Sequence, residues 1–135
     1  EISIEAGLTE GIEFNANYTY TDSEQKTGEY AGSPLNQLPK HLVQTSLRWA
    51  INDITSSWLR VHYRGEESQP TTGPSQDSLI APSYTLTDLG INYRFSAPIK
   101  LGAGIYNLFD KRIGMDEYGY VEDGRRYWLS LAWSF

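Results

Sequence analysis

The chain has 135 residues, a length suited to a single domain, of which 39% are hydrophobic and 13% aromatic. Its net charge of −6 at pH 7 argues against a nucleic-acid partner, and the absence of cysteine excludes disulfides and thiolate metal sites. The sequence contains no apolar run of about 18 residues and therefore predicts no transmembrane helix.

Hydrophobic residues recur at every second position along most of the chain, which is the period of a β-strand. Most of these segments have the length of about 9–11 residues with which a tilted strand crosses a bilayer. In chain order, the expected strands cover residues 2–8, 11–21, 41–51, 55–66, 83–95, 99–108 and 124–135.

Each expected strand has one apolar face and one polar face. The apolar faces include Leu47, Val61, Ile91, Leu101 and Leu131. The polar faces include Arg48, Arg60, His62, Arg64, Asp88, Arg94 and Arg126. Trp58, Leu86 and Trp128 depart from this division, because they are apolar residues at polar-face positions.

The connections between the strands are short at 8–11, 52–54 and 96–98, and long and polar at 22–40, 67–82 and 109–123. Short and long connections alternate strictly, so an up-and-down meander would gather all the long loops at one end. This is the pattern of an outer-membrane β-barrel, with short turns in the periplasm and long loops outside the cell.

A soluble β-sandwich or a lipocalin-like barrel also has alternating strands, with the apolar face turned inward. Three features favour the membrane barrel: the segregated loop lengths, the arginines at the middle of the polar faces, and aromatic residues near the strand ends, as in interfacial girdles. We therefore predict an all-β antiparallel meander whose polar face lines a lumen and whose apolar face meets lipid. The aromatic residues near strand ends are Tyr18, Tyr20, Tyr63, Tyr93, Phe95, Trp133 and Phe135.

The sequence predicts no catalytic or metal-binding site, and hence no enzyme. His41 and His62 have no acidic residues at metal-ligand spacing. Glu66 and Glu67 are adjacent at the end of an expected strand. Adjacent strand residues point to opposite faces, so these two carboxylates cannot flank one bond. The acidic residues within 116–123 are expected to be solvated, with divalent ions bridging them to lipopolysaccharide as the alternative.

The segment GAGIYN at residues 102–107 lacks the final glycine and the following helix of a nucleotide-binding loop. It is expected to be a strand with two small inward positions, Gly102 and Gly104. We expect these glycines to leave room for packing against a plug inside the barrel.

The motif YNLFDKR at residues 106–112, followed by YGYVEDGRRYWLSLAWSF at 118–135, resembles the C-terminus of TonB-dependent outer-membrane receptors. In that family an Asn-Leu-Phe-Asp-Lys stretch ends the penultimate strand and a Gly-Arg-Arg-aromatic stretch begins the last one. PLNQLPKHLVQTSLRW at 34–49 and SWLRVHYRG at 57–65 resemble the branch that takes up catecholate siderophores.

The resemblance implies a 22-stranded barrel with a plugged lumen in the bacterial outer membrane, without a cofactor. It implies ferric siderophore as the ligand and energy from an inner-membrane TonB complex, received through a box near the N-terminus. Residues 1–135 are then expected to be the C-terminal part of the barrel, with the plug and the N-terminal strands outside this sequence. The other implied partners are outer-membrane lipid, lipopolysaccharide and the barrel assembly machinery. A passive porin, a structural or adhesin barrel, and a soluble β-domain remain the alternatives.

Ligand contacts are expected from the long loops and the outer ends of the strands. Arginine and tyrosine suit an anionic, aromatic iron chelate, through charge-assisted hydrogen bonds and stacking. The candidates are Tyr30, Arg64, Gln69, Tyr84, Tyr118 and Tyr120, with ordinary loop and girdle roles as the alternative. The resemblance also implies that the assembly machinery reads the last strand, through Tyr127, Leu129, Leu131, Trp133 and Phe135.

Overall fold

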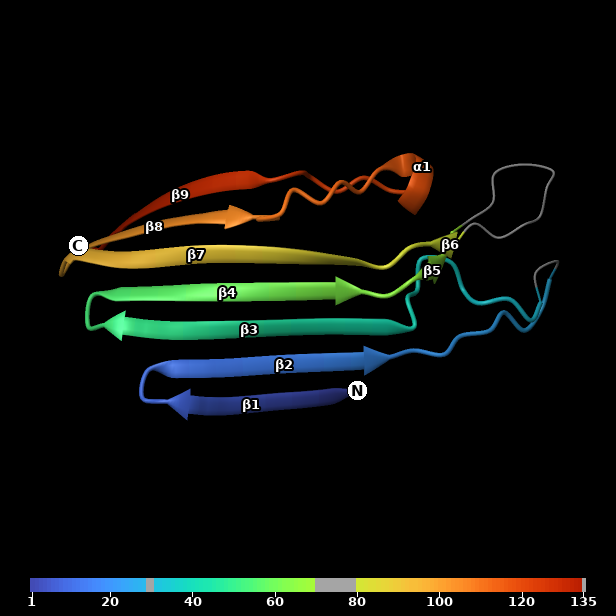
Figure 1. Ribbon diagram of the computed structural model, residues 1–135, viewed down its shortest axis with the longest axis horizontal. Helices are drawn as coiled ribbons and strands as arrows, with labels where there is room; N and C mark the ends of the chain where they lie inside the picture. The colour runs from blue at the N-terminus through green and yellow to red at the C-terminus, as the bar shows by residue number, and fades with distance from the viewer. Residues whose placement is uncertain (29–30, 70–79, 135) are drawn as a thin grey trace.

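Seven long strands form one antiparallel sheet in the computed structural model, which describes residues 1–28, 31–69 and 80–134 (Figure 1). The order in the sheet is β1-β2-β3-β4-β7-β8-β9, so each long strand pairs with its neighbour in sequence. Their bounds are β1 Ile2–Thr9, β2 Ile12–Tyr20, β3 His41–Asn52, β4 Thr55–Arg64, β7 Tyr84–Ser96, β8 Ile99–Tyr106 and β9 Arg126–Trp133. The expected all-β antiparallel meander of seven strands is thereby confirmed.

The long connections contain short elements that the alternation did not indicate. Within 67–82, the two-residue strands β5 (Glu67–Ser68) and β6 (Ile80–Ala81) pair with each other. Within 109–123, α1 (Met115–Tyr118) makes one helical turn, which ends at Gly119 in the left-handed conformation (φ 72°). No helix in the described ranges is long and apolar enough to cross a membrane.

The strand register separates the side chains into two faces, because directly opposed residues share a face. One row runs through Glu13, Arg48, Trp58, Gly90, Gly104 and Trp128 and belongs to the face that we call the polar face. The other face, the apolar face, contains the row Phe14, Leu47, Leu59, Leu89, Ile105 and Tyr127. All seven polar residues expected on one face, Arg48, Arg60, His62, Arg64, Asp88, Arg94 and Arg126, lie on the polar face.

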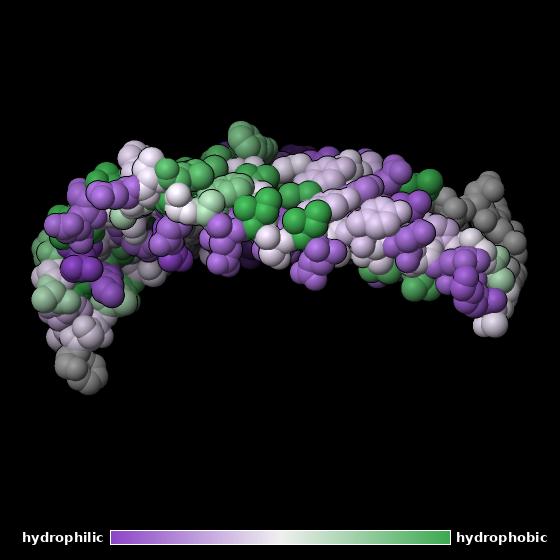
Figure 2. All heavy atoms as spheres, turned by 90° about the horizontal axis from the view of Figure 1, so that it is seen from below, coloured by the Kyte–Doolittle hydropathy of each residue, from purple (hydrophilic) through white to green (hydrophobic). Residues whose placement is uncertain are grey.

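The apolar face is not covered by any other part of the described chain. Leu129 is 88% exposed, and only Ala81, Ile113 and Tyr118 are buried hydrophobic residues among those described. Seen from the β1 side, the sheet is an arch with hydrophobic and hydrophilic residues interleaved along it (Figure 2). A soluble β-sandwich would bury such a face against a second sheet, so this arrangement argues against the soluble alternative.

The tryptophans that depart from the alternation lie flat on the polar face. Trp58 and Trp128 stack with ring centroids 6.2 Å apart, although β7 and β8 lie between their strands. A Cβ added to Gly90 would lie 2.4 Å from the Trp58 ring, and one added to Gly104 would lie 2.6 Å from Trp128 Nε1.

The expectation that Gly102 and Gly104 leave room for a plug therefore needs correction. A Cβ on Gly102 would lie 2.5 Å from Ser130 Oγ and 3.0 Å from the Trp128 ring. Side chains of the sheet itself occupy the space above both glycines. Because glycine has no side chain, the indole of Trp128 on β9 fits into this space.

Candidate functional site

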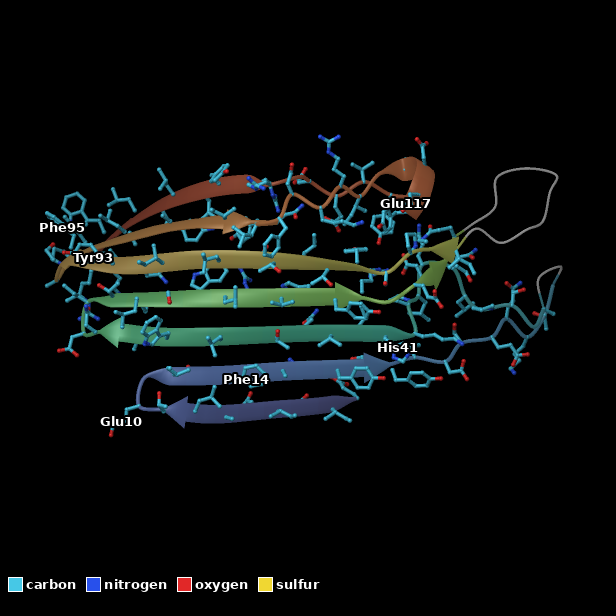
Figure 3. All side chains as sticks on the ribbon, in the orientation of Figure 1. Glu10, Phe14, His41, Tyr93, Phe95 and Glu117 are labelled. Atoms are coloured by element: carbon cyan, nitrogen blue, oxygen red, sulfur yellow. The ribbon has the colours of Figure 1, made fainter. Side chains whose placement is uncertain are left out.

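Residues from four segments meet at the end of the sheet where β4 ends and β7 begins, beside α1 (Figure 1). Side chains crowd this end in Figure 3, with Glu117 on α1, while Glu10, Tyr93 and Phe95 lie at the opposite, short-turn end. We call the residues that meet here the outer-end cluster; they are Arg64, Glu67, Gln69, Tyr84, Tyr118 and Tyr120.

A buried carboxylate organises the polar half of the outer-end cluster. Arg64 donates from Nε and from a terminal nitrogen to Glu67 Oε2, at 3.0 and 2.6 Å. Gln69 Nε2 donates to the second carboxylate oxygen at 3.1 Å. Arg64 also donates to the carbonyl oxygen of Gln37, at 3.0 Å. The Glu67 charge is thus paired and hydrogen-bonded, as a buried carboxylate requires.

Three tyrosines form the aromatic half of the cluster. The Tyr120 hydroxyl donates to the Tyr84 hydroxyl at 3.0 Å, and Tyr84 meets Tyr118 edge-on with centroids 5.4 Å apart. The Arg64 guanidinium lies 5.9 Å from the Tyr120 ring centroid, within reach of a cation–π interaction. Burial, and then the hydrogen bond to Tyr84, raise the pKa of Tyr120, so its phenol stays neutral at physiological pH.

The cluster brings together five of the six ligand candidates; the sixth, Tyr30, lies outside the described residues. Tyr118 is 0% exposed and Gln69 is 3% exposed, so in this structure they support the cluster from within. Arg64, Tyr84 and Tyr120 are partly exposed. Ligand contact by any of them stays a prediction.

A hollow of about 300 Å³ on the polar face adjoins the cluster. Arg64 and Tyr84 line it together with His62, Asp88 and Glu122. Sequence reasoning placed Glu67 and Glu122 in long loops at this end but did not identify Glu67 as the partner of Arg64 or Glu122 as a residue of the hollow. The only signal for Glu67 was its position three residues after Arg64, just beyond the end of a strand.

A second concentration of aromatic and cationic groups lies at the middle of the polar face. The Arg60 guanidinium sits 4.4 Å from the Trp58 ring centroid and 5.8 Å from that of Tyr106. Arg126 lies 5.3 Å from the same Tyr106 ring. Trp58, Arg60 and Tyr106 border a hollow of about 690 Å³ that also reaches Glu13 and Arg48. The signal for it in the sequence was the pair of tryptophans at polar-face positions, with glycines on the strands between.

The motif YNLFDKR closes the base of the loop between β8 and β9. Asn107, with φ 52° and 4% exposure, donates from Nδ2 to the carbonyl oxygens of Lys111 at 2.9 Å and Asp123 at 3.3 Å. Its Oδ1 accepts from Lys111 N at 2.9 Å. Asp110 Oδ1 accepts from Arg125 N at 2.8 Å. Both ends of the loop are therefore fastened at one point, which fixes where α1 and Tyr118 sit.

The last strand presents its alternate residues outward. Tyr127, Leu129, Leu131 and Trp133 are 70–88% exposed on the apolar face, and Phe135 lies outside the described residues. Within residues 1–28, 31–69 and 80–134, no three His, Asp or Glu side chains form a group that could hold a metal ion. His41 Nδ1 instead pairs with the Tyr18 hydroxyl, at 2.9 Å.

Comparison with known proteins places these features in a family. The β-barrel of the TonB dependent receptor-like family matches residues 1–108. The chain is 50% identical over all its 135 residues to the iron-regulated outer membrane virulence protein of Vibrio cholerae serotype O1, of which it covers 21%. It is 31% identical, with 95% of the chain aligned, to the ferric enterobactin receptor of Pseudomonas aeruginosa, of which it covers 19%.

Solved structures show the same architecture. A variant of the ferric enterobactin receptor PfeA from Pseudomonas aeruginosa superposes with a TM-score of 0.80 at 28% identity, over 98% of this chain and 21% of that one. The siderophore receptor PirA from Acinetobacter baumannii gives a TM-score of 0.84 at 24% identity, over 98% and 21%, which supports the fold alone. The chain spans about a fifth of the length of these relatives.

Proposed function

This chain belongs to the TonB-dependent receptor-like β-barrel family, and we propose that it is the C-terminal part of a receptor that takes up a ferric siderophore of the catecholate class. Its place is the bacterial outer membrane. The observation that carries the proposal is the similarity to a ferric enterobactin receptor along 95% of the chain. A variant of the Pseudomonas aeruginosa receptor has been solved in complex with enterobactin.

The sheet itself supports membership in a larger barrel. Among the described strands, β1 and β9 form the two edges of the sheet. Each is paired on one side only, so its other side exposes backbone hydrogen-bonding groups. In a bilayer such groups must be satisfied by further strands, since lipid offers no hydrogen bonds. We propose that upstream parts of the same protein supply these strands and a plug, and that TonB energises transport through the upstream part.

The outer-end cluster is the part of this chain proposed to meet the ferric chelate. Because Glu67 already neutralises Arg64, the cluster offers a chelate hydrogen-bond donors and aromatic faces, with no surplus positive charge. Tyr84 and Tyr120 present neutral hydroxyls beside the arginine. Such a surface suits the aromatic rings and oxygen atoms of a catecholate complex better than it suits a bare anion.

The proposal is tested with the full receptor, purified in detergent and titrated with ferric enterobactin while tryptophan fluorescence is recorded. We expect saturable binding, weakened about tenfold or more by the combined substitution Arg64→Gln, Tyr84→Phe and Tyr120→Phe. Tyr127→Phe, on the apolar face of β9, is the matched control and should bind normally.

Uptake of the iron-loaded siderophore by cells separates the proposed receptor from the alternatives. A receptor of this family needs TonB for uptake. Uptake that persists without TonB and falls off with solute size would indicate a passive porin. Binding of other metal chelates together with indifference to ferric catecholates would overturn the substrate class.

A further inference from the structure

Arg64 contacts one group from each of the three long connections at the outer end of the sheet (Figure 1). Its guanidinium donates to the carbonyl oxygen of Gln37 in the β2–β3 connection, at 3.0 Å. It also donates to Glu67 Oε2 in the β4–β7 connection, at 3.0 and 2.6 Å. The ring centroid of Tyr120, in the β8–β9 connection, lies 5.9 Å from the guanidinium carbon. One side chain therefore joins three segments that are far apart in the sequence.

Further contacts tie the connections to one another. The amide of Gln37 donates to the carbonyl oxygen of Ser68 at 2.8 Å, which links the β2–β3 connection to the β4–β7 connection. Ala81 of the β4–β7 connection packs with Ile113 and Tyr118 of the β8–β9 connection, and these three are the buried hydrophobic residues among those described. The β4–β7 connection is thus in contact with both of the others.

The backbone of Gln37 is held in a strained conformation at this junction. Its φ of 57° lies in the left-handed region that residues other than glycine rarely adopt. Such a conformation persists only where the surrounding structure fixes it. Here the N–H of Gln37 is bound to Ser68 and its carbonyl oxygen to Arg64. Loss of the Arg64 bond would therefore free the β2–β3 connection to relax.

Glu67 makes the connections depend on one another. It is 4% exposed, and Arg64 supplies the positive charge beside its carboxylate. Removing one partner of a buried ion pair is strongly destabilising, because the other charge is left without compensation. If the guanidinium moves away, the β4–β7 connection cannot keep Glu67 buried, and the packing of Ala81 against Ile113 and Tyr118 is weakened with it. The three connections should then open together and not one at a time.

We propose that Arg64 is the positioning residue of the outer end: through its guanidinium the three connections open and close as one unit, and a ferric chelate bound to any one of them holds all three closed. The part that concerns the chelate rests on the proposed function, whereas the coupling of the connections rests on their contacts alone. A chelate that binds only the closed unit shifts the population of the whole unit, because the connections share one opening equilibrium. Contact between Arg64 and the chelate is not required.

Hydrogen exchange at single amides of the full receptor in detergent tests the coupling. The reporters are the Gln37 amide, which donates to Ser68, the amides of the β5–β6 pair, and the Glu122 amide, which donates to Ile113. In Arg64→Gln we expect all of them to exchange about tenfold or more faster, by a common factor. Faster exchange at Gln37 alone, or clearly different factors in the three connections, would overturn the coupling.

Two further variants complete this measurement. Arg60→Gln makes the same change on the same strand and face, where the guanidinium lies over the Trp58 ring, and should leave all three connections protected. Glu67→Gln keeps the shape of the side chain and removes its charge, so it should loosen the same three connections to a smaller extent. Protected amides within β8 show that the sheet of each variant is folded. Wild-type exchange in both Arg64→Gln and Glu67→Gln would overturn the role given to the ion pair.

Ferric enterobactin added to the same samples tests the part that concerns the ligand, with binding followed in parallel by tryptophan fluorescence. In the wild type the chelate should slow exchange in all three connections by a common factor. In Arg64→Gln it should slow exchange only in the connection that it contacts. Binding that slows a single connection of the wild type would overturn the shared equilibrium. Absence of binding by the wild type would overturn the proposed function instead, and exchange without ligand would still decide the coupling.

Discussion

Replacing Asn107 by aspartate should loosen the loop between β8 and β9 while leaving the sheet intact. The Asn107 Nδ2 group donates to two carbonyl oxygens, those of Lys111 and Asp123, and Oδ1 accepts from Lys111 N. Aspartate keeps the acceptor and tolerates the positive φ of 52° at this position. It cannot donate when ionised, so a carboxylate oxygen would face two carbonyl oxygens.

The size of the effect follows from these contacts. Each lost hydrogen bond contributes about 0.5–1.5 kcal/mol net, which gives about 1–3 kcal/mol for the two donated bonds. Asn107 is buried, so the repulsion between the new charge and the carbonyl oxygens adds to this loss. An opening free energy lowered by about 3 kcal/mol corresponds to about a hundredfold more frequent opening of the loop.

Hydrogen exchange at single amides of the full receptor in detergent measures this opening. The Lys111 amide should exchange about a hundredfold faster in Asn107→Asp, and the Arg125 amide, which donates to Asp110, should follow it. Amides within β8, such as that of Leu101, should keep their protection.

Two further variants separate the loss of the side-chain hydrogen bonds from backbone strain at the positive φ and from the added charge. Asn107→Gly relieves the positive φ but loses all three side-chain bonds, so it should also open the loop. Asn17→Asp makes the same chemical change at an exposed position of β2 and should leave Lys111 protected. Protection of Lys111 in Asn107→Asp equal to that of the wild type would refute the role given to the side chain.

Three more outcomes are expected in the full receptor. Gly104→Ala puts a Cβ 2.6 Å from both a backbone carbonyl oxygen and an indole nitrogen, and should lower the free energy of unfolding by about 1–3 kcal/mol in chemical denaturation. Gly7→Ala, where the space around the glycine is open, should leave the free energy of unfolding unchanged. Equal losses in the two variants would count against the packing argument. The raised pKa of Tyr120 means that the unfolded chain ionises first, at its ordinary pKa of about 10, so stability should fall as pH rises above that value. In an absorbance titration, Tyr120→Phe should remove one tyrosine that ionises later than an ordinary tyrosine, and an unchanged titration curve would contradict this. Phe135→Ala should lower the amount of receptor assembled in the membrane much more than Leu131→Ala does. Equal defects in the two variants would mean that the last strand is part of the barrel wall and carries no assembly signal.

The strands could be predicted because apolar and polar residues alternate along most of them with a period of two, and this pattern can be read within each contiguous segment of the sequence. The structure ends the expected strand 55–66 at Arg64, and Glu67, just beyond this end, accepts hydrogen bonds from Arg64. The pair β5–β6 and the turn of α1 carry too few residues for any period to appear. Their positions depend on contacts between segments far apart in the sequence.

The candidate site was predictable in its residue types and only partly in its geometry. Arginine and tyrosine at the outer ends of strands marked the correct region, but nothing in the sequence indicates that Tyr118 is buried beneath Tyr84. Nothing in the sequence indicates the stacking of Trp58 on Trp128 either. It requires the glycines of β7 and β8 to lie in the same row, which only the strand register reveals.

The cations of the polar face differ in what they contact. Arg64, at the outer end, is satisfied by Glu67, and Arg60, at the middle, lies against the ring of Trp58. Arg94 and Lys100, at the short-turn end, have no anion among the described residues. A surface whose charges are met from within needs no partner to stay folded, and is free to exchange a ligand. The outer end therefore keeps its arrangement without a ligand, as the proposed reversible binding of a chelate requires.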